Sequence, residues 1–159
     1  CPLNIYCKAY KNNTVHLYPS NTKKNKKPLI KVCVAILKNK KQFLLTKRIN
    51  KTFLNGLWEL PGGKIKKGEN KKKCIQRSLK ENLGINIIKI DRELSETKHA
   101  YSHFNVLLYS FITSQWSLKN KKLSDKNLKW VTKKSMMSIP IPSSTKTILH
   151  QFFKEYHVL

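Results

Sequence analysis

Apolar positions divide the first half of the chain into a hairpin and a helix. Residues 30–37 form a β-branched, partly alternating run, and a Lys-Asn turn separates them from residues 42–46, whose centre is apolar. This arrangement predicts a β-hairpin. Farther along, helical spacing relates Cys74, Ile75, Leu79 and Leu83. The spacing predicts a helix with an aliphatic core face that ends at Gly84.

The region that follows predicts mainly β-structure. Residues 85–90 read as a strand, and residues 94–99 with 104–112 read as a second hairpin. The polar segment between the two strands of this hairpin contains Tyr101, Ser102 and His103. We expect these three residues at or near the tip of the hairpin, where side chains face outward.

The last part of the chain predicts a short strand and a closing helix. Residues 116–129 are polar and predict a loop, residues 130–131 a short strand, and residues 139–142 a rigid connector. Ser143 or Ser144 can cap the helix. Its apolar face comprises Ile148, Leu149, Phe152 and Phe153. This order of elements predicts an α+β fold, a mixed β-sheet sandwiched between helices.

Composition divides the chain into three parts. Residues 1–18 are mixed polar and aromatic, residues 19–29 form a basic linker, and residues 30–159 hold the predicted elements. No apolar run approaches the length of a membrane span, so we expect no membrane partner. The chain starts with Cys1, and its opening residues lack the pattern of a signal peptide, so we expect a piece of a longer protein.

Charge points to a polyanionic partner. The net charge of +25 results from 33 basic and 8 acidic residues. A coding sequence rich in A and T would also raise the number of lysines, but it does not obviously explain the scarcity of Asp and Glu. The balance therefore favours contact with nucleic acid.

Residues 58–85 have the outline of a pyrophosphohydrolase motif. After Trp-Glu-Leu-Pro-Gly-Gly, Gly63 is followed by five residues and Glu69, then by seven residues and Arg77. This spacing resembles the Nudix box, G-x5-E-x7-R-E-U-x-E-E-x-G-U, in which U is a bulky aliphatic residue. The resemblance implies a Nudix-like fold and a helix whose carboxylates bind Mg²⁺.

Most of those carboxylates are missing. The acidic positions of the box correspond to Ser78, Glu81 and Asn82, of which only Glu81 is acidic. Mg²⁺ is a hard cation held by oxygen ligands, and lysines nearby in the sequence repel it. We therefore interpret the box as a signature of the fold without its metal chemistry.

Cysteines supply a further, weaker signal. Cys1 and Cys7 are spaced C-x5-C, whereas Cys33 and Cys74 lie within apolar patterns and are expected in the core. Two thiols alone define neither a zinc site nor an iron–sulfur site, each of which usually needs four ligands.

The cysteine pair, the carboxylate-poor box and the motif Tyr101-Ser102-His103 occur in the order found in MutY-type adenine DNA glycosylases. The chain resembles the C-terminal part of that family over essentially its whole length. The resemblance implies that Cys1 and Cys7 are the last two ligands of a [4Fe-4S] cluster in the full-length parent. It also implies base excision repair, in which a Nudix-like domain recognises 8-oxoguanine opposite the mispaired adenine in double-stranded DNA.

The resemblance also implies roles for individual residues. Tyr101, Ser102 and His103, together with His99, are the candidate residues for contact with DNA and 8-oxoguanine. Unlike guanine, 8-oxoguanine carries a proton on N7, so the Ser102 hydroxyl can accept a hydrogen bond from it. The glycosylase's catalytic residues would lie before Cys1, so no catalytic residue for base excision is expected in this chain. We also expect the protein to be monomeric and cytoplasmic.

Two other functions stay open. Leu60-Pro61-Gly62-Gly63-Lys64 is closer to an active hydrolase of the MutT type. The alternative is therefore a Nudix hydrolase, an 8-oxo-dGTP diphosphatase, with Mg²⁺ on Glu81 helped by Glu69. A nonspecific basic binding module would instead bind nucleic acid with an affinity that depends on salt and ignores the lesion.

Overall fold

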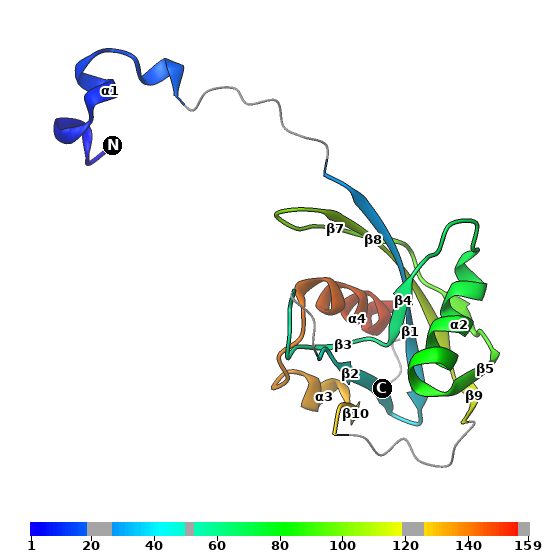
Figure 1. Ribbon diagram of the computed structural model, residues 1–159. Helices are drawn as coiled ribbons and strands as arrows, with labels where there is room; N and C mark the ends of the chain where they lie inside the picture. Colours follow the sequence, from blue (N-terminus) through cyan, green and yellow to red (C-terminus); the bar gives the residue numbers. More distant parts are fainter. Residues whose placement is uncertain (19–26, 50–52, 119–125, 156–159) are drawn as a thin grey trace.

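The computed structural model describes residues 1–18, 27–49, 53–118 and 126–155 (Figure 1). Within residues 1–18 lie three short helical turns: η1 (Asn4–Tyr6), α1 (Lys8–Lys11) and η2 (Val15–Leu17). The strands are β1 (Leu29–Asn39), β2 (Gln42–Lys47), β3 (Trp58–Glu59), β4 (Gly62–Lys64), β5 (Ile85–Lys89), β6 (Arg92–Glu93), β7 (Thr97–Ala100), β8 (Asn105–Thr113), β9 (Gln115–Leu118) and β10 (Leu128–Val131). The remaining helices are α2 (Lys71–Leu83), α3 (Lys133–Met136) and α4 (Ser143–Glu155).

A mixed sheet forms the centre of the fold. Its strand order is β10-β2-β1-β8-β6, with β3 paired to β2, β4 to β1 and β7 to β8. Strands β1 and β8 run parallel over nine residue pairs, and the other pairs are antiparallel. A separate antiparallel pair joins β5 to β9.

Strand β1 shows why the sheet has helices on both faces. Its side chains alternate in direction, as the period of two residues requires. Cys33, Ala35 and Leu37 pack with Cys74, Ile75 and Leu79 of α2. Val34 and Ile36 pack on the opposite side with Ile148, Leu149 and Phe152 of α4. Each fully buried aliphatic or aromatic side chain in these two layers contributes about 1.5–3 kcal/mol to folding. The predicted α+β sandwich is confirmed.

Several predicted elements are confirmed. The first hairpin joins β1 to β2, and α2 ends at Gly84, which has a φ of 64° and donates to the carbonyl of Lys80. The second hairpin is formed by β7 and β8. The closing helix is α4, although it begins at Ser143, so Ser143 and Ser144 lie in its first turn and do not precede it.

Two predictions were wrong in detail. Residues 116–129 were expected as a loop, but residues 115–118 form β9, and β10 starts at Leu128. Of the strand expected over residues 94–99, only residues 97–99 are in a strand, as part of β7, and the short strand β6 precedes this segment. The linker expected at residues 19–29 lies mostly outside the described residues. No helix within the described residues is long and apolar enough to cross a membrane.

Strand β4 was not predicted, because Pro61-Gly62-Gly63 locally favours a turn. It pairs with β1 through Cys33↔Gly63 and Val34↔Gly62. A side chain at Gly62 would overlap the carbonyl oxygen of Cys33. Glycine therefore allows the two backbones to approach closely, and this approach fixes the entrance to the Nudix-box loop.

Candidate functional site

The tip of the β7–β8 hairpin is the first candidate site. The last pair of the ladder is Ala100↔Asn105, and the backbone NH of Tyr101 donates to the carbonyl of Phe104 at 2.9 Å. Ser102 and His103 therefore occupy the turn, and both are exposed. The structure thus places these two predicted residues together, with their polar groups available to a ligand.

Tyr101 faces inward and anchors the turn. Its ring centroid lies 4.8 Å from that of Phe53, 4.5 Å from that of His99 and 5.1 Å from that of Phe104. Its hydroxyl is 3.1 Å from Oγ of Ser144, in the first turn of α4. Tyr101 and the half-buried His99 therefore support the tip, and the surface that faces outward belongs to Ser102 and His103.

A lysine ties the entrance of β1 to the same turn. The ammonium group of Lys27 donates to the carbonyl of Tyr101 at 2.9 Å. The backbone NH of Asn105 donates to the carbonyl of Pro28, also at 2.9 Å. A positive charge is thus fixed beside Ser102 and His103, where it favours an anionic ligand.

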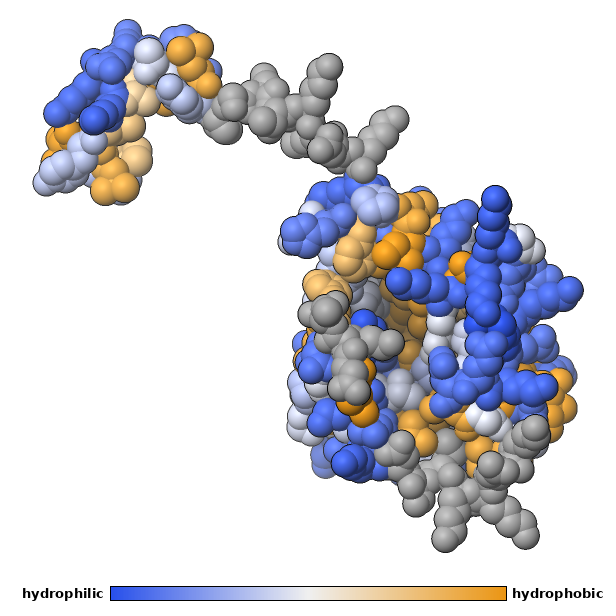
Figure 2. Space-filling model, viewed as in Figure 1, coloured by the Kyte–Doolittle hydropathy of each residue, from blue (hydrophilic) through white to orange (hydrophobic). Residues whose placement is uncertain are grey.

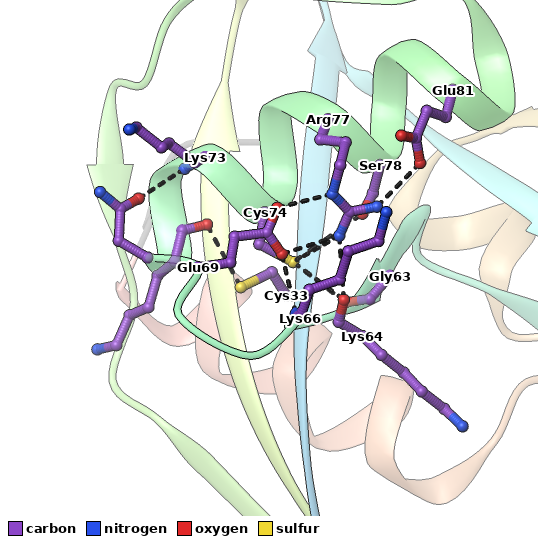
Figure 3. Close-up of polar contacts among 12 residues, drawn as sticks. Cys33, Gly63, Lys64, Lys66, Glu69, Lys73, Cys74, Arg77, Ser78 and Glu81 are labelled. Atoms are coloured by element: carbon purple, nitrogen blue, oxygen red, sulfur yellow. Dashed lines mark hydrogen bonds and ion pairs between the residues drawn. The ribbon is translucent and has the colours of Figure 1, made fainter.

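The second candidate site is the Nudix box, built on α2 and the loop before it (Figure 3). Asn70 caps the helix by accepting from the backbone NH of Lys73 at 2.8 Å. Arg77, in the second turn, donates to both carboxylate oxygens of Glu69, at 2.6 and 2.9 Å. The same guanidinium donates to Glu81 at 2.9 Å and to the carbonyl of Lys64 at 3.2 Å. Both acids of the box are therefore bonded to one arginine.

This network stabilises the ionised form of Glu69. The Arg77 guanidinium, followed by the backbone NH of Lys66, lowers the pKa of Glu69 to about 2. The two carboxylates in turn raise the pKa of Arg77. A bidentate, charge-assisted contact of this kind has a defined geometry. Glu69 therefore fastens the loop at residues 63–69 to α2, which is a structural role.

The other two acidic positions of the box have no carboxylate, and their side chains contact the glycines of β4. Ser78 is 1% exposed and lies against Gly63, where a Cβ atom would contact its Oγ. The side-chain amide of Asn82 donates to the carbonyl of Gly62 at 3.3 Å. These side chains hold β4 against α2, and neither supplies a charged oxygen ligand.

The donor set of the box does not fit a Mg²⁺ ion. A site of this type needs clustered oxygen ligands, usually carboxylates, whereas Glu69 and Glu81 are both paired with Arg77. Across residues 1–18, 27–49, 53–118 and 126–155, no three His, Cys, Asp or Glu side chains are grouped in a way that could hold a metal. The interpretation of the box as a signature of the fold without metal chemistry stays a prediction, which turnover of 8-oxo-dGTP tests.

The four cysteines divide as the sequence suggested. Cys33 and Cys74 are fully buried, and burial is the main cause that raises the pKa of both thiols. Cys1 is exposed, Cys7 is half-buried, and both are free thiols. An iron–sulfur cluster needs four ligands, so two thiols of the described residues would not by themselves form a complete cluster site.

Comparisons with known proteins establish the family. The NUDIX domain model matches residues 32–151, and the chain belongs to the NUDIX domain family. The 8-oxo-dGTP diphosphatase of Buchnera aphidicola subsp. Schizaphis graminum is 28% identical over 77% of this chain and 92% of its own length. The adenine DNA glycosylase of the same organism is 30% identical over 96% of this chain, which spans 42% of the glycosylase. The crystal structure of the MutT NUDIX hydrolase from Burkholderia pseudomallei matches with a TM-score of 0.69 at 22% identity, covering 79% of this chain and 98% of that one.

Sequence reasoning did not identify three residues that shape the tip. Phe53, Ser144 and Lys27 contact Tyr101 from positions 48, 43 and 74 residues away in the chain. No local pattern links them to the hairpin. The aromatic character of Phe53 was the only available signal.

Proposed function

We propose that this chain is a lesion-recognition module that binds 8-oxoguanine in duplex DNA without hydrolysing nucleotides. In this proposal it corresponds to the C-terminal part of an adenine DNA glycosylase acting in base excision repair. The observation that carries the proposal is the contrast between the two candidate sites. Both carboxylates of the Nudix box are paired with Arg77, whereas Ser102 and His103 at the hairpin tip are exposed.

The tip has the chemistry to distinguish 8-oxoguanine from guanine. The base edge of 8-oxoguanine offers an N7 donor where guanine has a bare acceptor. The Ser102 hydroxyl can accept from this donor, and His103 can bond a base edge or a phosphate. Tyr101 and His99 act as positioning residues, because their rings pack together beneath the turn. A rigid turn reduces the entropy lost on binding.

The rest of the chain is consistent with a partner made of double-stranded DNA that carries 8-oxoguanine opposite adenine. The net charge of +25 favours a polyanion, and lysines contact phosphates without regard to sequence. The similarity to the adenine DNA glycosylase extends over 96% of the chain, beyond residues 32–151, which match the NUDIX model. Cys1 and Cys7 are proposed as two ligands of a [4Fe-4S] cluster completed by cysteines outside this chain.

The second candidate function is that of an 8-oxo-dGTP diphosphatase. The names of the relatives favour it more than the first candidate, since several carry that name and the chain matches 92% of one of them. It requires Glu81 to leave Arg77 and to bind Mg²⁺, with help from Glu69. Both candidates share one ligand group, the 8-oxoguanine base, and differ in whether a phosphoanhydride bond is cleaved.

Turnover of 8-oxo-dGTP distinguishes the two candidates. The purified chain is incubated with 8-oxo-dGTP and Mg²⁺, and release of pyrophosphate is measured for the wild type and for Glu81→Gln. The lesion-recognition proposal predicts no release from either protein, together with tighter binding to a duplex containing 8-oxoguanine than to one containing guanine. Release that disappears in Glu81→Gln would establish the hydrolase instead.

A further inference from the structure

A groove of about 510 Å³ lies between the start of β1, the loop before α2 and strand β8. Lys31, Lys66 and Lys67 line it, and all three are exposed. Within the described residues, no ion pair joins any of these three ammonium groups to an acid. In Figure 2, hydrophilic residues cover the side of the molecule where α2 and this loop lie.

The acidic groups near the groove are already neutralised. Glu69, which also lines it, is paired with Arg77. Lys71 forms an ion pair with Glu93 at 3.1 Å, and its ammonium group lies 4.0 Å from the ring centroid of Tyr109. The three remaining lysines therefore leave the groove with an uncompensated positive charge that suits an anionic ligand.

The groove and the hairpin tip are connected by β1 and β8. Leu29 pairs with Asn105, directly after the tip, and Cys33 pairs with Tyr109, at the groove. Asn105 and Tyr109 are four residues apart on one strand, which corresponds to about 13 Å. Phosphates of one DNA strand are spaced about 3.4 Å apart along the helix axis. Leu29 and Tyr109 both line the groove, so it extends along β8 from beside the tip to a distance of about four base pairs.

We propose that this groove binds the phosphodiester backbone of nucleic acid, with Lys31, Lys66 and Lys67 as the phosphate-contacting residues. The course of the groove indicates phosphates within about four base pairs, on one side, of the base at Ser102, and this placement of the base rests on the proposed function. A groove that extends about 13 Å along β8 can contact several successive phosphates of one strand, which favours a polymer as the ligand. Lysine is suited to the task because its ammonium is a point charge that binds phosphates regardless of sequence.

A matched pair of double variants tests the groove. Lys66→Gln/Lys67→Gln removes two charges from the groove, and Lys40→Gln/Lys41→Gln removes two charges from the β1–β2 turn, at the opposite end of β1. Affinity for a guanine duplex is measured from 50 to 200 mM salt. Each lost phosphate contact reduces the slope of log affinity against log salt by about 0.9.

The groove variant is expected to lower the slope by about 1.8, so the wild type loses about 12-fold more affinity than the variant over this salt range. The turn variant is expected to keep the wild-type slope. Equal slopes for both variants would overturn the proposal, because the charge would then act only through the net total. The unfolding midpoints of the two variants are also measured, and equal midpoints would show that a difference in slope reflects binding and not stability.

The position of the lesion in the duplex gives a second readout. One duplex carries 8-oxoguanine two base pairs from one end, and a second duplex carries it two base pairs from the other end. The slope difference between wild type and groove variant is expected to decrease for only one of them, since the groove extends to one side of the tip. Persistence of the difference in both would contradict the placement. If the wild type showed no preference for the lesion duplex, the proposed function would be refuted. The slopes measured on guanine duplexes would still show whether the groove binds phosphates.

Discussion

The hydrogen bond between Tyr101 and Ser144 provides a way to distinguish the residues that position the tip from those that contact a base. Tyr101→Phe removes the hydroxyl that lies 3.1 Å from Oγ of Ser144, a side chain only 9% exposed. A hydrogen bond of this type contributes about 0.5–1.5 kcal/mol. Its loss is expected to lower the free energy of unfolding by that amount and the melting temperature by about 2–4 °C for each kcal/mol.

A double-mutant cycle with Tyr101→Phe and Ser144→Ala isolates this contact. Urea unfolding of the four proteins is expected to give a coupling energy of about 0.5–1.5 kcal/mol, since the two side chains touch. Ser102→Ala is the control, because Ser102 is exposed and its removal is expected to leave the unfolding midpoint unchanged. A coupling energy near zero would refute the anchoring role of Tyr101.

Ser102→Ala and Tyr101→Phe are expected to differ in their effect on DNA binding. Ser102→Ala is expected to reduce the preference for 8-oxoguanine over guanine about 2- to 13-fold, which is the range that a single neutral hydrogen bond provides. Tyr101→Phe keeps the aromatic ring that holds the turn, so it is expected to retain most of the preference. If Tyr101→Phe lowered the preference as much as Ser102→Ala, the division between positioning and reading would be wrong.

Three further predictions concern the scaffold. Gly62→Ala is expected to destabilise the fold by about 1–3 kcal/mol in urea unfolding, because its methyl group overlaps the carbonyl of Cys33; an unchanged midpoint would contradict the close approach of β4 and β1. The depressed pKa of Glu69 means that its ionised form stabilises the fold above the ordinary value near 4.5, and that this stability is lost as the pH falls toward 2. Urea midpoints of the wild type should therefore fall more steeply than those of Glu69→Gln between pH 4.5 and 2, and parallel curves would count against the Arg77 network. Leu79→Ala, in the fully buried core face of α2, is expected to cost about 2–5 kcal/mol by the same assay, and a cost below 1 kcal/mol would show that this face is not packed as described.

Elements with a strong local pattern could be predicted from the sequence. The alternation of β1, the helical spacing of Cys74, Ile75 and Leu79, and the polar interruption at residues 101–103 each lie within one short segment. Local spacing decides which side chains share a face, so these elements and the position of the hairpin tip followed directly. The absence of acidic residues at positions 78 and 82 could also be read directly from the sequence.

Features that depend on distant residues could not be predicted. Strand β9 is polar on one side, but Trp116 stacks on Trp130 at 5.8 Å and donates to the carbonyl of Lys38 at 3.2 Å. These contacts, made across the fold, favour a strand where composition favours a loop. The same holds for Phe53 and Ser144 at the tip, since only the folded chain brings them to Tyr101.

The most direct test of lesion recognition is the ratio of dissociation constants for two duplexes that differ only in 8-oxoguanine or guanine opposite adenine. The ratio is measured for the wild type and for Ser102→Ala with His103→Ala. The account predicts tighter binding of the lesion duplex by the wild type and a ratio close to one for the tip variant, with guanine-duplex affinity largely retained. Equal affinities of the wild type for both duplexes would contradict recognition of 8-oxoguanine by this chain.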